Sequence, residues 1–266
     1  LQDATPKLEK LFVSDMQNLK EIWPPQFSIS NLCQLRELMV EGCDSIEVLF
    51  NMDFGEIEQL RSSLRSIRVR RCDSLVKLFS CNPFLFFNNL QELTVGICGS
   101  IQVLFNTDLG RAGKSEEQVC SSSLRSIKVY KCKSLVNLFP VNPMPLFNHL
   151  EELRVRWCAS VEVIFDIDMG CAGETDKVSS SSRLRSIYLE ELGKLREVWR
   201  IKDDGNNLIH GFEAVERIDI RYCWRFENII TPATTNFEMR ALKQVKIQVK
   251  MVESKQDQEV YTTLNI

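Results

Sequence analysis

The sequence predicts an α/β repeat solenoid, and three observations support this fold class. One pattern of apolar residues recurs nine times along the 266 residues. The first apolar positions of each copy alternate with period two, as in a strand with one buried face. The later positions have the wider spacing of a helical or 3₁₀-like turn. Because one such unit cannot cover its own apolar side chains, the units must stack on each other.

The recurring pattern, called the repeat frame below, is L-x-x-L-x-V-x-x-C-x-x-L-x-x-L-F, with other apolar residues at several positions. It is clearest from Leu64 to Phe79 and from Leu124 to Phe139, where eleven of sixteen positions are identical. We expect a single leucine-rich-repeat domain over residues 1–266, with a C-terminal cap or tail over residues 250–266. About nine repeats start near residues 8, 35, 64, 90, 124, 150, 184, 215 and 242.

Such a stack is a leucine-rich-repeat horseshoe. Its strands would form a parallel β-sheet on the concave face, about 4.8 Å apart, and the convex side would be mostly irregular or 3₁₀. Inserts rich in Gly, Ser and acidic residues, such as 106–123 and 166–182, would lie on the convex or lateral side. The first repeat starts at Leu8 with little before it to cover its edge, so we expect another domain to precede it.

Composition limits the setting in which this chain works. With 44% apolar residues and a net charge of −3, it has the balance of a folded domain and no global basic excess. No apolar run is long enough for a membrane span. The absence of CxxC pairs and of Asn-x-Ser/Thr sequons favours a reducing compartment, cytoplasmic or nucleo-cytoplasmic.

The chemistry-bearing residues do not form a catalytic or metal-binding pattern. A zinc site needs converging ligands, whereas six cysteines recur once per repeat and are expected to pack in the core. The run from Gly110 to Ser115 ends like a phosphate-binding loop, but Asp108 stands where the first Gly is required. His149 and His210 have no nucleophilic partner in sequence, so we expect no enzyme, no cofactor and no metal. The in-frame cysteines are Cys43, Cys72, Cys98, Cys132, Cys158 and Cys223.

Several runs resemble the C-terminal leucine-rich repeats of plant intracellular nucleotide-binding disease-resistance receptors of the coiled-coil class. They are LRSIRVRRCDSLVKLF, LRSIKVYKCKSLVNLF and LEELRVRWCASVEVIF. The resemblance implies a recognition and autoinhibition module in plant innate immunity. Its partner would be a pathogen effector, a guarded host protein or the receptor's own nucleotide-binding domain. The substrate-selecting adaptor of a ubiquitin ligase is the alternative function.

The positions that alternate with the buried ones carry the candidate binding surface. In the third to sixth repeats they hold seven basic and two acidic residues, a local net charge of +5 that favours an acidic partner. Interspersed aromatic residues would serve as anchors, although a merely solvated sheet or a nucleic-acid surface would have similar residues. The predicted partner-binding residues are Arg68, Arg70, Arg71, Lys128, Tyr130, Lys131, Arg154, Arg156, Trp157, Tyr188, Arg221 and Tyr222.

Overall fold

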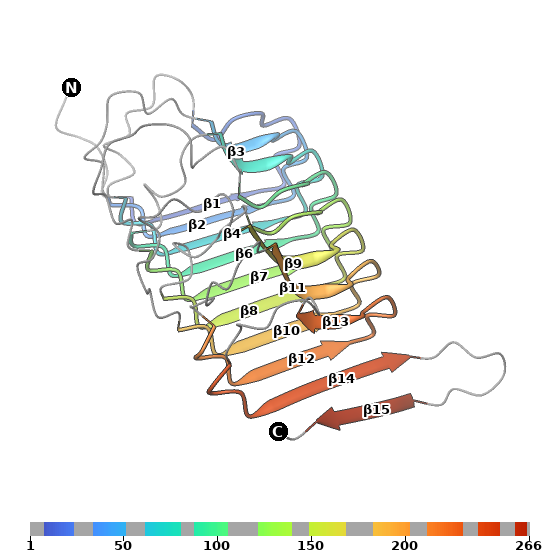
Figure 1. Ribbon diagram of the computed structural model, residues 1–266. Coiled ribbons are helices and arrows are strands. Elements are labelled where there is room, and N and C mark those ends of the chain that lie inside the picture. Colours follow the sequence, from blue (N-terminus) through green and yellow to red (C-terminus); the bar gives the residue numbers. More distant parts are fainter. Residues whose placement is uncertain are drawn as a thin grey trace, which may run out of the picture.

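The computed structural model consists of strands and turns, with no helix in the part of the chain that it describes (Figure 1). The described residues are 8–23, 34–51, 62–80, 88–105, 122–139, 149–168, 183–202, 212–230, 239–250 and 259–264. The phosphate-loop-like run 110–115, His210 and the out-of-frame cysteines lie outside these ranges.

A ten-stranded sheet runs through the whole molecule, and its first nine strands are parallel. Each of these nine begins two residues after a repeat start. The fold class predicted from sequence is therefore confirmed. The parallel strands are β1 (Lys10–Ser14), β2 (Glu37–Glu41), β4 (Ser66–Arg70), β6 (Glu92–Gly96), β7 (Ser126–Tyr130), β8 (Glu152–Arg156), β10 (Ser186–Glu190), β12 (Arg217–Arg221) and β14 (Gln244–Lys250). The tenth strand, β15 (Glu259–Leu264), pairs with β14 in the antiparallel sense.

The sheet has one buried side because the repeat frame places apolar side chains at alternate strand positions. In β4, Ile67 and Val69 are fully buried, whereas the residues between and beside them reach solvent. The register aligns each frame position with the same position of the next strand, as Val69 aligns with Val95. One continuous hydrophobic core results, and it runs along the stack.

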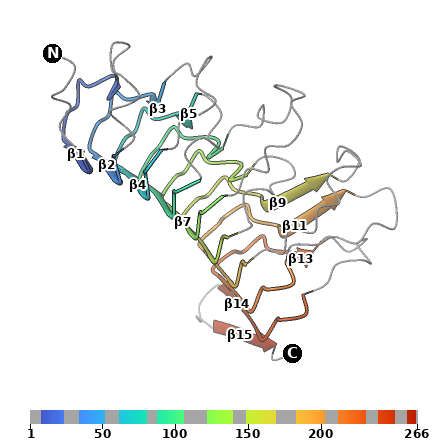
Figure 2. The ribbon, with the colours of Figure 1, turned by 90° about the vertical axis from the view of Figure 1, so that its left-hand side faces the viewer.

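The second half of the frame forms one turn and then a short extended segment. In the third repeat the N–H of Leu75 donates to the carbonyl of Cys72, 3.2 Å away, so the 3₁₀-like spacing is realised as a single turn. Five short strands follow such turns and lie across the core from the large sheet (Figure 2). They pair in parallel as β3 (Val48–Phe50) with β5 (Lys77–Phe79), and as β9 (Val163–Asp168), β11 (Glu197–Lys202) and β13 (Asn228–Ile230).

The aromatic residue that ends the frame stacks on its counterpart in the next repeat. Phe139 lies 5.3 Å from Phe165, and Phe165 lies 5.4 Å from Trp199, measured between ring centroids. These offset contacts fill the side of the core opposite the large sheet. Tryptophan at the frame end therefore replaces phenylalanine without interrupting the stack.

A left-handed residue follows the strand in each of the first eight repeats. Seven of these eight residues are not glycine, and their φ angles lie between 50° and 55°. Each N–H donates to a carbonyl of the next strand, as Arg71 does to Gly96 at 3.1 Å and Trp157 does to Glu190 at 2.8 Å. The left-handed turn thus extends the ladder by one residue. The residues are Asp15, Gly42, Arg71, Ile97, Lys131, Trp157, Glu191 and Tyr222.

This conformation predicts an unusual order of stability at Glu191, which is exposed and has a φ of 51°. Glu191→Gly should be about 1 kcal/mol more stable than Glu191→Ala, because glycine adopts the left-handed region without a steric cost. Urea denaturation measures the difference. At exposed Lys194, whose φ is not positive, the alanine variant should be the more stable one. Equal stability of the two Glu191 variants would contradict the interpretation.

Candidate functional site

The twelve predicted partner-binding residues lie on one surface, the side of the ten-stranded sheet that faces away from the core. We call this surface the open face. It contains the first, third and fifth residues of each parallel strand together with the left-handed residue that follows. All twelve predicted residues occupy such positions, and each is half-buried or exposed. Their role in binding stays a prediction.

The left-handed residue explains why two consecutive side chains reach the open face at the end of a strand. In a fully extended chain, Arg71 would point into the core after Arg70. Its φ of 50° turns the side chain outward instead, and the buried Cys72 comes next. The same geometry exposes the pairs Tyr130 and Lys131, and Arg156 and Trp157.

The open face is less basic than the sequence count indicated, because carboxylates from neighbouring repeats or from the same strand pair with many of the cations. Glu41 lies 3.3 Å from Arg71 and 3.9 Å from Arg70. Glu190 forms an ion pair with Arg156, and Asp219 lies 2.6 Å from Arg221. Along the nine parallel strands and their left-handed residues, eleven basic side chains face eight acidic ones. The net charge of the open face is thus +3 over nine strands, whereas the +5 counted from sequence covered only four.

Tyr188 is the centre of a cluster of cations and aromatic rings on strands β8, β10 and β12. The guanidinium carbons of Arg154, Arg156 and Arg221 lie 6.0, 5.8 and 5.2 Å from its ring centroid. Arg156 also lies 4.1 Å from the ring of Trp157. Cation–π contacts of this kind attract the guanidinium groups to the faces of the rings.

Hydrogen bonds fix this cluster further. The guanidinium of Arg221 donates to both carboxylate oxygens of Asp219, at 2.9 and 2.6 Å, and this bidentate pair raises the pKa of Arg221. Burial, with a further contribution from Glu190, raises the pKa of Tyr188, so its hydroxyl stays protonated. The cluster is therefore an ordered and nearly charge-balanced platform that a partner can contact without rearranging it.

Tyr130 lies flat across Gly96 on the neighbouring strand β6. A Cβ atom at position 96 would overlap the Tyr130 ring, and the register pairs these two residues directly. Arg70 then lies 5.9 Å from the centroid of the same ring. The glycine is thus required by close contact with the ring.

Two exposed aromatic side chains were not predicted from the sequence. Trp224 is 62% exposed and lies over Gly193 of the preceding repeat, while Phe12 on the edge strand β1 is 61% exposed. Trp224 lies in the turn directly after Cys223, where period-two alternation predicts neither exposure nor burial. Gly193, at the same turn position one repeat earlier, was the sequence feature that could have indicated this packing.

A family model described as "Plant disease resistance protein RPS2-like, leucine-rich repeats" matches residues 55–121 and 112–250. The chain belongs to this leucine-rich-repeat family of plant disease resistance proteins.

One relative is a protein of Arabidopsis thaliana that is named as a disease resistance protein. It is 24% identical to this chain over 184 residues, which cover 68% of this chain and 11% of that protein. The chain thus corresponds to a small part of the relative's length. The described residues include no helix long and apolar enough to cross a membrane.

The in-frame cysteines of this disease-resistance repeat domain form hydrogen bonds with the backbone at the ends of the parallel strands. Each in-frame thiol donates to the carbonyl two residues earlier, as Cys72 does to Arg70 at 3.3 Å and Cys98 does to Gly96 at 3.3 Å. The neighbouring Cys132 thiol raises the pKa of Cys98 to about 12, and burial raises the pKa of Cys223 to about 12. The thiols of Cys98 and Cys223 are therefore protonated at neutral pH and act as packing groups. His149 is bonded to the carbonyl of Ser122 at 2.6 Å.

The contact between Gly96 and Tyr130 is testable by a double-mutant cycle. Gly96→Ala should destabilise the protein by about 1 to 3 kcal/mol, because the added methyl group displaces the ring. In a Tyr130→Ala background the same change should cost less than about 0.5 kcal/mol. Chemical denaturation of the four proteins gives the coupling. An equal cost in both backgrounds would show that the ring does not limit position 96.

Proposed function

We propose that this chain is the protein-recognition and autoinhibition module of a plant immune receptor, and that it binds its partner through the open face. Membership of the disease-resistance family supports the receptor, since the repeat domains of such proteins generally mediate protein interactions. The partner is a pathogen effector, a guarded host protein or the receptor's own nucleotide-binding domain. The module works without catalysis, in the cytoplasm.

The observation that carries this proposal is the platform around Tyr188. Arginine, tryptophan and tyrosine are the residues most enriched at energetic hot spots of protein interfaces. Here the guanidinium of Arg156 on β8 contacts both the ring of Trp157, which follows it, and the ring of Tyr188 on the neighbouring strand β10. Because internal contacts already order these side chains, they lose little conformational entropy when a partner binds.

The direction of the strands defines the extent of the binding surface. The register aligns Lys128, Arg154 and Tyr188 across three neighbouring strands. A partner lying across the strands would contact one row of side chains from consecutive repeats. This arrangement allows recognition to depend on a few residues per repeat, while the core positions stay unchanged.

The proposal predicts that Trp157→Ala and Tyr188→Ala each weaken partner binding by about 2 kcal/mol, close to 30-fold. The partner in the first experiment is the nucleotide-binding domain of the same receptor, co-expressed in leaf tissue and measured by co-immunoprecipitation. Loss of autoinhibition would appear as cell death without a pathogen.

Val136→Ala is the control, because Val136 is 44% exposed and lies after the turn of its repeat, outside the open face. Thermal unfolding verifies that all variants remain folded. If folded Trp157 and Tyr188 variants bind every tested partner as the unmodified chain does and keep the receptor silent, the open face is not the recognition surface.

A further inference from the structure

Strand β6 has its lowest outward point at Thr94, in the middle of the open face. Thr94 is much smaller than the outward residues beside it on the flanking strands, whereas Gly96 is covered by the ring of Tyr130. The register places Thr94 between Arg68 on β4 and Lys128 on β7. Two strand spacings separate the backbones of Arg68 and Lys128 by about 10 Å. Thr94 therefore forms the floor of a slot with one cation on each side.

The two cations beside this slot have few carboxylate partners. Within the described ranges, no carboxylate lies within ion-pair distance of exposed Arg68. Lys128 reaches only Glu152, at 4.0 Å, and that carboxylate lies 2.6 Å from Arg154. Arg68 and Lys128 thus leave positive charge that is poorly neutralised on both sides of Thr94.

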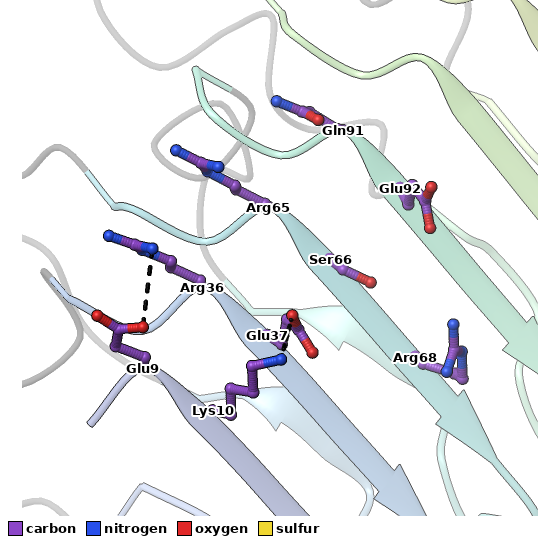
Figure 3. A pocket seen from close by; sticks show the side chains of 9 residues that line it. All are labelled: Glu9, Lys10, Arg36, Glu37, Arg65, Ser66, Arg68, Gln91 and Glu92. Atoms are coloured by element: carbon purple, nitrogen blue, oxygen red, sulfur yellow. Dashed lines mark ion pairs between the residues drawn. The ribbon is translucent and has the colours of Figure 1, made fainter.

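A hollow of about 490 Å³ adjoins Arg68 on the side where the strands begin (Figure 3). Arg36 pairs there with Glu9, and Lys10 pairs with Glu37, whereas no ion pair joins Arg65 or Arg68 to another side chain lining the hollow. Ser66 and Gln91 add neutral hydrogen-bond donors to the same wall. The slot and the hollow adjoin each other, so together they present several hydrogen-bond donors to one anionic ligand.

We infer that the slot over Thr94 binds a carboxylate side chain of an acidic protein segment, held between Arg68 and Lys128. This inference rests on the proposed function and names the chemistry of the partner. The Thr94 hydroxyl, which has no side-chain hydrogen bond to another described residue, donates to the bound carboxylate. A second acidic residue of the same segment reaches Arg65 in the hollow.

A protein segment fits this surface better than a nucleic acid does. Glu92 and Glu152 flank the slot on the same face, and they would repel a continuous line of phosphates. Strong nucleic-acid binding requires the neutralisation of many phosphates by unpaired cations. A polypeptide can place its acidic residues only where the cations are and present neutral residues elsewhere.

Fluorescence anisotropy with a labelled hexaglutamate peptide tests the inference on the whole chain at low salt. Arg68→Gln combined with Lys128→Gln should weaken binding about tenfold or more. Arg185→Gln combined with Lys243→Gln is the matched control, because it removes the same charge at two residues that already pair with Glu216 and line neither the slot nor the hollow. Equal losses in the two double variants would overturn the inference, and so would tighter binding of a thymidine hexanucleotide than of hexaglutamate.

A second variant tests the slot without any added ligand. Thr94→Glu places a carboxylate of the chain itself between the two cations, so it should block hexaglutamate binding and raise the melting temperature by about 2 °C relative to Thr94→Gln. The difference in melting temperature should disappear in 1 M salt. If Thr94→Gln blocks binding as well as Thr94→Glu does, or if the glutamate variant is not the more stable one, the inferred pairing of a carboxylate with Arg68 and Lys128 is wrong.

These outcomes are distinct from failure of the proposed function. If the Trp157 and Tyr188 variants lose the receptor partner while the Arg68 and Lys128 double variant does not change hexaglutamate binding, the recognition surface stands and the slot is rejected. If the slot binds hexaglutamate but neither aromatic variant affects the receptor, the proposed function fails.

Discussion

The hydrogen-bonded ladder between consecutive repeats is the constraint on which the rest of this molecule depends. It pairs residues of the same frame position in neighbouring strands, from Lys10 with Glu37 at one end to Ile220 with Ile247 near the other. This register stacks equal positions on each other, so a buried residue is covered by its counterpart in the next repeat. The left-handed residues extend the ladder by one hydrogen bond per repeat beyond the strand. The cysteine then enters the core directly after that bond.

The same register divides the open face into two chemically different parts. On β8, β10 and β12 the arginines are paired with carboxylates and packed on aromatic rings, so this part is ordered and close to neutral. On β4, β6 and β7 the small residue Thr94 separates two cations, Arg68 and Lys128, that have few acidic neighbours. A partner would thus meet hydrophobic anchors at one part and a local positive charge at the other. Both parts follow from which side chain occupies each outward position, because the backbone is the same in every repeat.

The sequence predicts the parts of the structure that repeat. Alternation with period two identified Ile67 and Val69 as inward residues and Arg68 and Arg70 as outward ones, and the burial of each agrees. The in-frame cysteines were likewise predicted to pack in the core, and all six are buried. These predictions succeed since one geometric rule applies to all copies.

The features that sequence reasoning missed depend on contacts between different repeats. Glu41 neutralises Arg71 across the register, and a count within single repeats could not include this pairing. The left-handed conformation of Ile97 has no local signal, because a β-branched residue normally avoids it and only the ladder imposes it. The position of Tyr130 over Gly96 likewise requires the neighbouring strand to be known. In each case tertiary structure overrides local preference.

Amide hydrogen exchange of the left-handed residues tests the central claim most directly. Their N–H groups follow the ends of the strands but donate to the next repeat, as those of Lys131 and Glu191 do at 2.9 Å. The account predicts that these amides exchange as slowly as the strand amides before them and much more slowly than the amide of Lys133, for which no backbone hydrogen bond occurs among the described residues. Exchange of the Lys131 and Glu191 amides at the rate of Lys133 would contradict the extended ladder and the open face that depends on it.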